Sequence, residues 1–452
     1  MRYAHRTISA RDFLLLCLVF LLALIIRIQY VQPLVDDIFV ARDAGEYVTY
    51  GRNLVEHGTF SKDASRLTPR PDSYRSPGYP TFIALLLWGA GGENFLKWLI
   101  YAQAILGALL VPLIFLTGLF FLPVAGAMVS ALLTAFSPHL ITTTGCVLTE
   151  TLFGFLLLAA VCCLQYAFGK PTAWCYAVSA ILFGCAYLTN EASLFVPYLL
   201  AGVSFISPAI RKTIIINRLL VGRMVAFLII FTLFPAAWMT RNQINVPADA
   251  SKASDRAVVT MSHGAYPDFI YKNPYYRRFP YREDPMQPAF GASIEGFSRI
   301  LWSRTKENPG RYLRWYLVGK PYFLWSWDII QGIGDIYINP VSVSLFEVSL
   351  LGRMIKGTMK FIYPLILLLA VLSMPTVFFR WAKSRNEKGA LQNLPVLPLS
   401  ICIYFTALYT IFAPWPRYGI PLRPELYLCA VWALTFFTRT LGNRWRTSDA
   451  YP

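Results

Sequence analysis

Two short polar segments near the N-terminus carry the residue types best suited to chemistry. The first, Arg42–Tyr47, contains Asp43 and Glu46, and the second, Tyr74–Pro80, contains Arg75 and follows about thirty residues later. A carboxylate beside lipid headgroups can accept a proton, and a nearby arginine can bind a phosphate through parallel hydrogen bonds. The two segments therefore predict acid–base chemistry beside a bound phosphate.

The composition of the chain indicates the setting in which these polar segments lie. Of 452 residues, 56% are hydrophobic and 14% are charged, and the mean hydropathy is +0.49. Soluble proteins carry roughly 25% charged residues, and a membrane-spanning helix needs about 20 apolar residues. Continuous apolar stretches recur along the chain and do not alternate as strands of a transmembrane barrel do. The sequence predicts an all-α polytopic membrane protein.

The formal net charge of +17 is explained by basic segments between membrane spans, and no nucleic acid partner is expected. Lys and Arg concentrate on the cytoplasmic side of membrane proteins. Such residues mark the N-terminus, 211–223, 380–388 and 439–446 as cytoplasmic. Seven apolar candidates precede Arg211, but an even number must cross if both ends lie inside. The shortest, 78–91, is expected to be an interfacial or re-entrant helix.

The remaining pattern gives a bundle of about ten transmembrane helices, with outer-face loops that bear juxtamembrane helices. The expected spans are 12–30, 98–118, 122–137, 150–168, 173–189, 194–208, 222–238, 357–379, 395–413 and 421–438. The outer face would then carry 31–97, 138–149, 190–193, 239–355 and 414–420. Three parts follow: an N-terminal transmembrane module (1–238) with an outer catalytic loop (31–97), an outer-face periplasmic segment (239–355), and C-terminal helices with a cytoplasmic tail (356–452).

Two stretches of the outer-face segment, Tyr271–Arg282 and Tyr312–Trp327, are rich in aromatic and basic residues. They are expected to form an aromatic belt at the membrane surface. The alternative is a surface on which the acceptor docks.

Several charged residues fall on the expected outer side. They are Asp43, Glu46, Arg75, Glu150, Glu191, Arg241 and Arg417. Charged groups near membrane depth are costly and are functional candidates by default. Some of these residues also have a purely structural explanation. Glu191 could be a turn or cap residue, Glu150 a helix N-terminal residue, and Arg241 and Arg417 interfacial anchors. Their convergence on one face favours a site.

The first loop also resembles a known family. Segments 43–47, 51–61 and 74–80 are similar to the first periplasmic loop of bacterial GT-C glycosyltransferases, which are related to protein O-mannosyltransferases and to the aminoarabinose transferase of lipid A. Further similar motifs follow in order, at 137–150, 188–192, 237–242 and 417–421. Asn190 stands where the family often has Arg-Pro, and one proline is displaced to Pro235. The resemblance covers most of residues 10–440 and is weakest at 250–350, where acceptor choice is expected.

This resemblance implies a hexosyl- or pentosyltransferase that uses a sugar on polyprenyl phosphate. Asp43, favoured by the motif over Asp36 and Asp37, would be the general base of a single inverting displacement. The expected phosphate ligands are Arg75, Arg241 and Arg417. The expected substrate-orienting residues are Glu46, Tyr47, Tyr79, Glu150 and Tyr418. The sequence has no P-loop for binding a nucleotide. The acceptor is left open among glycans, lipids and proteins.

The scheme requires no cofactor and leaves a divalent metal open. The eight cysteines and four histidines lack metal-ligand spacing. The expected location is the bacterial inner membrane, in contact with its lipids and with both termini cytoplasmic. A transporter or flippase of a lipid-linked sugar is the alternative, but it would place polar groups and broken helices at the bilayer midplane. A third possibility is a non-enzymatic membrane scaffold, for which charges at span ends need not converge.

Overall fold

A computed structural model of the chain describes residues 2–3, 6–65, 67–169, 172–206, 218–268, 284, 286–329, 336–339, 341–383 and 394–448. Strand structure in these ranges is confined to two paired two-residue strands, β1 (Arg2–Tyr3) and β2 (Arg6–Thr7). The rest of the regular structure is helical, which confirms the all-α class. The aromatic stretch Tyr271–Arg282 lies outside the described residues.

Every one of the ten expected spans coincides with a helix. These are α1 (Ala10–Val31), α4 (Phe95–Gly118), α5 (Val124–Ala135), α7 (Glu150–Gly169), α8 (Ala173–Thr189), α9 (Val196–Ile206), α11 (Arg218–Asn245), α18 (Leu350–Lys383), α20 (Val396–Ile411) and α21 (Arg423–Ser448). In the described part of the chain, α1, α4, α7, α11 and α18 are each long and apolar enough to cross a membrane. The protein is therefore a multi-pass membrane protein, and the count of ten crossings stays a prediction.

A sixth candidate span is bent. The pair α5 and α6 (Pro138–Thr142), which continues into the 3-10 turn η3 (Thr143–Gly145), bends by 50° at its break. The break frees backbone carbonyls inside the bundle, and the fully buried Arg27 of α1 binds two of them. Its guanidinium donates to Ala135 O at 3.1 Å and to Thr134 O at 3.2 Å. A buried arginine here completes the backbone hydrogen bonding of a broken helix.

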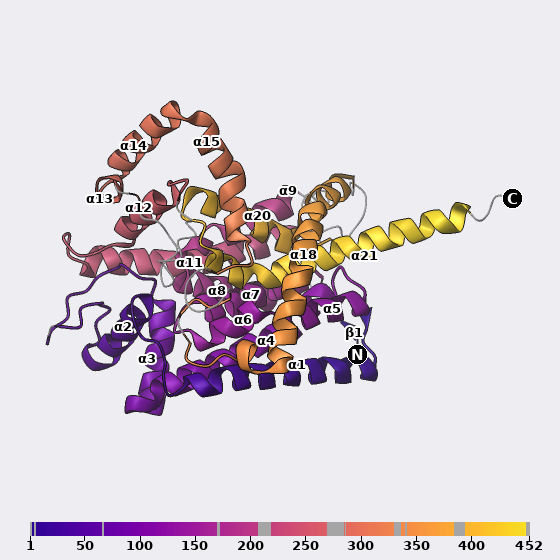
Figure 1. Cartoon of the computed structure of the whole chain (residues 1–452), viewed down its shortest axis with the longest axis horizontal. Coiled ribbons are helices and arrows are strands. Elements are labelled where there is room, and N and C mark those ends of the chain that lie inside the picture. The colour runs from indigo at the N-terminus through magenta and orange to yellow at the C-terminus, as the bar shows by residue number, and fades with distance from the viewer. Residues whose placement is uncertain are drawn as a thin grey trace.

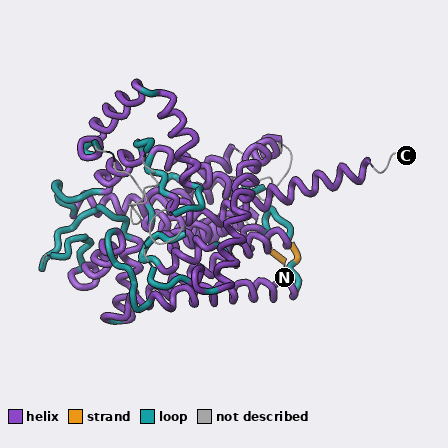
Figure 2. The backbone as a smooth tube through the Cα atoms, in the orientation of Figure 1, coloured by secondary structure: helices purple, strands orange, loops and turns teal. Residues whose placement is uncertain are grey.

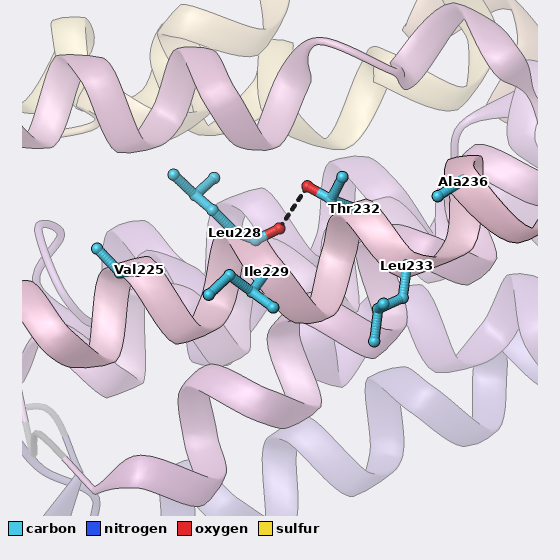
Figure 3. Close-up of a pocket in the computed structure, with 6 residues that line it drawn as sticks. All are labelled: Val225, Leu228, Ile229, Thr232, Leu233 and Ala236. Atoms are coloured by element: carbon cyan, nitrogen blue, oxygen red, sulfur yellow. Dashed lines mark hydrogen bonds between the residues drawn. The ribbon is translucent and has the colours of Figure 1, made fainter.

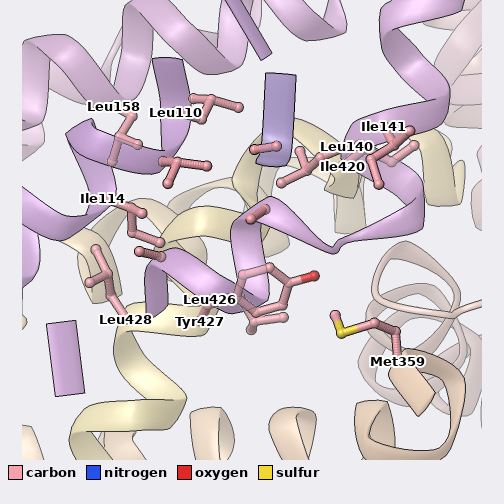
Figure 4. Packing of buried hydrophobic residues seen from close by; sticks show 14 of the residues in the cluster. Leu110, Ile114, Leu140, Ile141, Leu158, Met359, Ile420, Leu426, Tyr427 and Leu428 are labelled. Carbon is pink, nitrogen blue, oxygen red and sulfur yellow. The ribbon is translucent and has the colours of Figure 1, made fainter. Parts of the chain in front are cut away.

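One part of the bundle core is centred on α4, which packs against α5, α7 and α21. Leu110 and Ile114 of α4 lie beside Leu158 of α7 and Leu428 of α21 (Figure 4). Tyr427 of α21 donates from its hydroxyl to Ser137 Oγ at 2.9 Å, directly at the α5–α6 break. Close packing and such interhelical hydrogen bonds, rather than transfer from water, hold helices together in lipid. Because α21 is packed in this way, the loop that precedes it is also fixed.

Short helices of the expected outer loops lie at one end of the bundle (Figure 1). In Figure 1, the start of α1 and the end of α21 lie on the right, whereas α2 (Asp43–His57), α3 (Gly78–Ala90) and α12 (Ala253–Gly264) lie on the left. Most loops lie on that left side too (Figure 2). The side of the membrane on which each end of the chain lies stays a prediction.

The expected outer segments form short helices. Besides α2, α3 and α12 these are α13 (Gln287–Phe290), α14 (Ile294–Glu307), α15 (Pro309–Arg314), the π-helix η5 (Trp315–Gly319), α16 (Lys320–Leu324) and α17 (Leu345–Val348), with 3-10 turns η1 (Gln32–Leu34), η2 (Gly92–Asn94), η4 (Glu191–Ser193) and η6 (Pro416–Leu422). Helix α3 has 13 residues, so at 1.5 Å per residue it is roughly 20 Å long. It is shorter than the roughly 30 Å hydrocarbon core of a bilayer.

Candidate functional site

The carboxylate of Asp43 lies between two arginines from opposite ends of the chain. Arg75 Nη2 donates to Asp43 Oδ1 at 2.7 Å, and Arg417 Nη2 donates to Asp43 Oδ2 at 2.6 Å. Asp43 belongs to the first turn of α2, Arg75 precedes α3, and Arg417 lies in η6. Two of the three expected phosphate ligands thus meet at the expected base.

The backbone at Asp43 is set by an unusual neighbour. Arg42, the residue before α2, has a φ of 53°, the one positive value that a described residue other than glycine adopts. Such a conformation costs on the order of 1–3 kcal/mol and persists only where the surrounding structure imposes it. It places Asp43 at the N-terminus of α2, where the helix dipole also favours a negative charge.

Charge balance keeps Asp43 ionised. Burial alone would raise the pKa of this carboxyl, but Arg417 and Arg75 outweigh it and hold the pKa well below its ordinary value. In the arrangement seen here Asp43 is therefore a weak base. A ligand that drew the two guanidinium groups away from Asp43 would raise the pKa of Asp43 and make it a stronger base.

Two further carboxylates expected at the site contact the same arginines. Arg75 Nε donates to Glu46 Oε2 at 2.6 Å, so one guanidinium bridges Asp43 and Glu46. Arg417 Nε lies 3.6 Å from Oε1 of Glu150, which is buried at the first residue of α7. Glu150 is thus both the helix N-terminal residue that the sequence allowed and a member of the charged cluster.

The three tyrosines expected to orient substrate line the cluster. The Tyr47 ring lies edge-on to that of Tyr79, with centroids 5.2 Å apart, and the Arg75 guanidinium lies 5.1 Å from the Tyr47 centroid. Tyr79 is fully buried and donates to Gln103 Oε1 at 2.8 Å. The Arg417 guanidinium lies 5.4 Å from the ring of Tyr418. Aromatic faces of this kind stabilise the cations and restrict their movement.

A close backbone contact fixes the segment that carries Arg75. A Cβ added to Gly78, at the start of α3, would lie 2.7 Å from Thr189 Oγ1 and 2.8 Å from the Leu188 carbonyl. Only glycine permits this approach of α3 to the end of α8. The contact brings Ser76 next to the outer turn at Glu191, and Ser76 Oγ donates to Glu191 Oε2 at 3.2 Å.

Sequence reasoning missed one arginine of the cluster. Arg256, on α12, forms an ion pair with Glu191, and its guanidinium lies 5.8 Å from the ring of Tyr74. The sequence allows Glu191 to be a turn or cap residue. The structure places it at the start of η4, but Asn190 makes the turn contact, accepting from Ala192 N at 3.1 Å, and the Glu191 side chain is left for Arg256. The sequence carries no signal for Arg256, because neither an apolar span nor a family motif lies beside it.

Arg241 is not part of the Asp43 centre. It lies in α11, and its guanidinium donates to Asp72 O at 2.7 Å and to Phe60 O at 3.3 Å. It therefore supports the backbone of the first outer loop, and the expected approach to Asp43 is not seen. The competing carboxylates Asp36 and Asp37 are exposed, and Asp36 pairs with Lys97 at 3.1 Å.

Two apolar hollows follow α11 towards the cluster. The first, about 320 Å³, is lined by α11 residues from Val225 to Ala236, including Leu233 (Figure 3). The second, about 390 Å³, shares Leu233 and is completed by Trp238, Leu188 and Pro77. Pro77 is two residues from Arg75, so the apolar surface leads to the charged centre. Among the described residues no group of His, Cys, Asp and Glu is arranged to hold a metal ion.

Comparison with known proteins yields likeness in structure only. No protein family model and no curated protein sequence matches the chain. The archaeal oligosaccharyltransferase of Archaeoglobus fulgidus in its apo form is 12% identical, with a TM-score of 0.50 over 97% of this chain and 52% of its own. The same organism's oligosaccharyltransferase AglB, in complex with an inhibitory peptide and a dolichol-phosphate, is 11% identical, with a TM-score of 0.50 over 98% of this chain and 52% of its own.

ArnT from Cupriavidus metallidurans bound to undecaprenyl phosphate is 12% identical, with a TM-score of 0.47 over 94% of this chain and 61% of its own. The chain thus spans about half the length of the archaeal proteins that it matches. The likeness to the archaeal structures confirms the expected GT-C type fold.

Proposed function

We propose that this protein transfers a hexose or pentose from a polyprenyl-phosphate carrier to an acceptor hydroxyl, with inversion at the anomeric carbon. The observation that carries the proposal is the position of Asp43 between Arg75 and Arg417. A base and two phosphate-binding cations at one point are what such a displacement needs. The attacking hydroxyl loses a proton, and the leaving phosphate gains negative charge.

The ion pairs suggest how donor and base act together. A donor phosphate that binds Arg75 and Arg417 competes with Asp43 for the same N–H groups. Its arrival removes hydrogen bonds that favour the ionised carboxylate, so the pKa of Asp43 rises towards its ordinary value. Asp43 then takes the acceptor proton, the acceptor oxygen bonds to the anomeric carbon, and the sugar–phosphate bond breaks. The arginines stabilise the released polyprenyl phosphate.

The apolar hollows along α11 provide a place for the carrier's hydrocarbon chain. Ile229 and Leu233 are 58% and 61% exposed, and the second hollow ends at Pro77 beside Arg75. An isoprenoid laid along α11 would bring its phosphate to the charged cluster. The AglB structure, of the same fold, holds a dolichol-phosphate, which supports a lipid-linked donor.

The alternative, a flippase of a lipid-linked sugar, is less well supported. A flippase would need polar groups near the bilayer midplane at a broken helix. The described part of the chain has one bent pair, α5 and α6, and the buried Arg27 there binds backbone carbonyls. The cluster of Asp43 and its arginines instead lies at helix ends. A scaffold protein would have no need of such a convergence.

The proposed setting is the outer face of the bacterial inner membrane, with both termini cytoplasmic and no cofactor required. A direct test is mass spectrometry of surface glycans and lipids from cells with and without the protein, paired with transfer by the purified protein from a membrane lipid extract. We expect one glycan or lipid to lose a single sugar in cells that lack the protein, and the purified protein to restore it. Unchanged glycans and lipids, together with an inactive purified protein, would reject the proposal.

A further inference from the structure

Helix α12 of the outer segment is joined to three parts of the site. Before it, Ser73 N donates to Ser251 O at 3.2 Å, which ties the chain to the first loop. At its end, a Cβ added to Gly264 would lie 2.4 Å from Phe412 O, so α12 packs directly on the backbone that leads to η6 and Arg417. Between these ends Arg256 reaches Glu191. The position of Arg256 is therefore set by the same segments that position Asp43, Arg75 and Arg417.

The Arg256–Glu191 pair is available to a ligand. The two side chains are 24% and 38% exposed. Glu191 uses one oxygen for Arg256 and the other for Ser76 Oγ, and a carboxylate oxygen can accept more than one hydrogen bond. Arg256 has five N–H donors. The pair thus presents hydrogen-bond acceptors and donors side by side.

Another ion pair also links the first outer loop to the outer segment that carries α12. Arg70 Nη2 binds Asp249 Oδ1 at 3.0 Å and Arg70 Nη1 binds Oδ2 at 3.2 Å, in a two-bonded pair between the first loop and the same outer segment. The first loop is thus already linked to the segment that leads into α12 without the Arg256–Glu191 pair. The Arg256 pair differs from the Arg70 pair because it lies next to Ser76, one residue from Arg75.

A pair of a carboxylate and a guanidinium is suited to bind hydroxyl groups. A sugar hydroxyl both donates and accepts a hydrogen bond, so it can bind a carboxylate and a guanidinium at once. In a polyprenyl-phosphate sugar the ring is bonded directly to the phosphate. A phosphate on Arg75 would therefore place the ring beside Ser76 and Glu191, with the carrier chain leaving past Pro77 and Leu188.

We infer that Arg256 and Glu191 bind the hydroxyls of the sugar being transferred, and so determine which donor is used. This inference rests on the proposed glycosyl transfer. It makes the pair a substrate-binding element distinct from Arg75 and Arg417, which bind the phosphate. The distinction is measurable, because polyprenyl phosphate without a sugar should contact one set of residues and not the other.

The experiment compares two constants for the purified full-length protein. One is the KM for donor in a membrane lipid extract, and the other is the Ki of added sugar-free undecaprenyl phosphate as a competing ligand. Arg256→Gln and Glu191→Gln should each raise the donor KM by about 10-fold, the effect of losing a hydrogen bond to a charged group. The Ki should stay within about twofold of the wild-type value. Arg75→Gln should raise both constants.

Arg70→Gln is the matched control, because it breaks the other arginine pair between the first loop and the outer segment and should change neither constant. An acceptor KM that rises while the donor KM stays at the wild-type value would overturn the inference. So would a Ki that rises in parallel with the donor KM in Arg256→Gln, or variants that behave as wild type. If the wild-type protein itself transfers no sugar, the proposed function fails and the inference with it.

Discussion

Asp43 and Arg417 are separated by 374 positions in the sequence, yet their side chains form a 2.6 Å hydrogen bond. The contact joins the first outer loop to the last one. With Arg75 on the other carboxylate oxygen, it defines the place where donor, acceptor and base are proposed to meet.

Arg75 and Arg417 are predicted to bind the donor phosphate. A hydrogen bond to a charged group contributes about 1.5–3 kcal/mol, so Arg75→Ala or Arg417→Ala should weaken donor use roughly 10- to 100-fold. Lysine should restore only part of the loss, since it returns the charge without the two-bonded geometry. The measurement is transfer at varied donor concentration, with Arg70→Ala as control. Wild-type donor dependence in both alanine variants would assign these arginines to the membrane interface.

Arg241 is predicted to act through the first loop. Arg241→Gln loses the contacts to Asp72 O and Phe60 O, so the loop should become more mobile. We expect faster protease cleavage between residues 60 and 73, and a lower kcat because a displaced loop misplaces Asp43. The donor KM should stay near the wild-type value, because the lost contacts lie outside the phosphate site. A donor KM that rises 10-fold or more, with unchanged cleavage, would return Arg241 to the set of phosphate ligands.

The lowered pKa of Asp43 predicts how its contribution to stability depends on pH. Its folded-state pKa is lowered, so its contribution to stability is fully present above the ordinary carboxyl pKa of about 4 and is lost as pH falls through the folded value. The difference in Tm between wild type and Asp43→Asn should therefore be constant from about pH 5 to 8 and shrink only in stronger acid. A difference that changes between pH 5 and 7 would show that Asp43 titrates there.

Helix α3 is predicted to stay on the outer side without crossing. Asn94 is exposed in the turn that follows it, whereas Gly92 in the same turn has a φ of 58° that a cysteine would strain. In a background without native cysteines, Asn94→Cys should be labelled from outside intact cells by a membrane-impermeant reagent. Labelling only after permeabilisation would mean that α3 spans the membrane.

Much of this fold could be predicted from the sequence, because the property that drives helices into lipid is local. Each of the ten expected spans contains a helix, and the convergence of Asp43, Arg75, Glu150 and Arg417 followed from placing alternate loops on one side. The partners of Arg241 could not be predicted, because they are backbone carbonyls, which no residue type marks. The contact between Arg256 and Glu191 was missed because it depends on how α12 packs across three distant segments.

The most direct test of the account is the transfer activity of purified Asp43→Asn. Asparagine keeps the size of the side chain but cannot take the proton from the acceptor hydroxyl. A general base contributes roughly 10²–10⁴-fold to the rate. The variant should insert, fold and bind sugar-free undecaprenyl phosphate, while its kcat falls by at least about 100-fold. Transfer near the wild-type rate would contradict the central claim and remove Asp43 from the role of base.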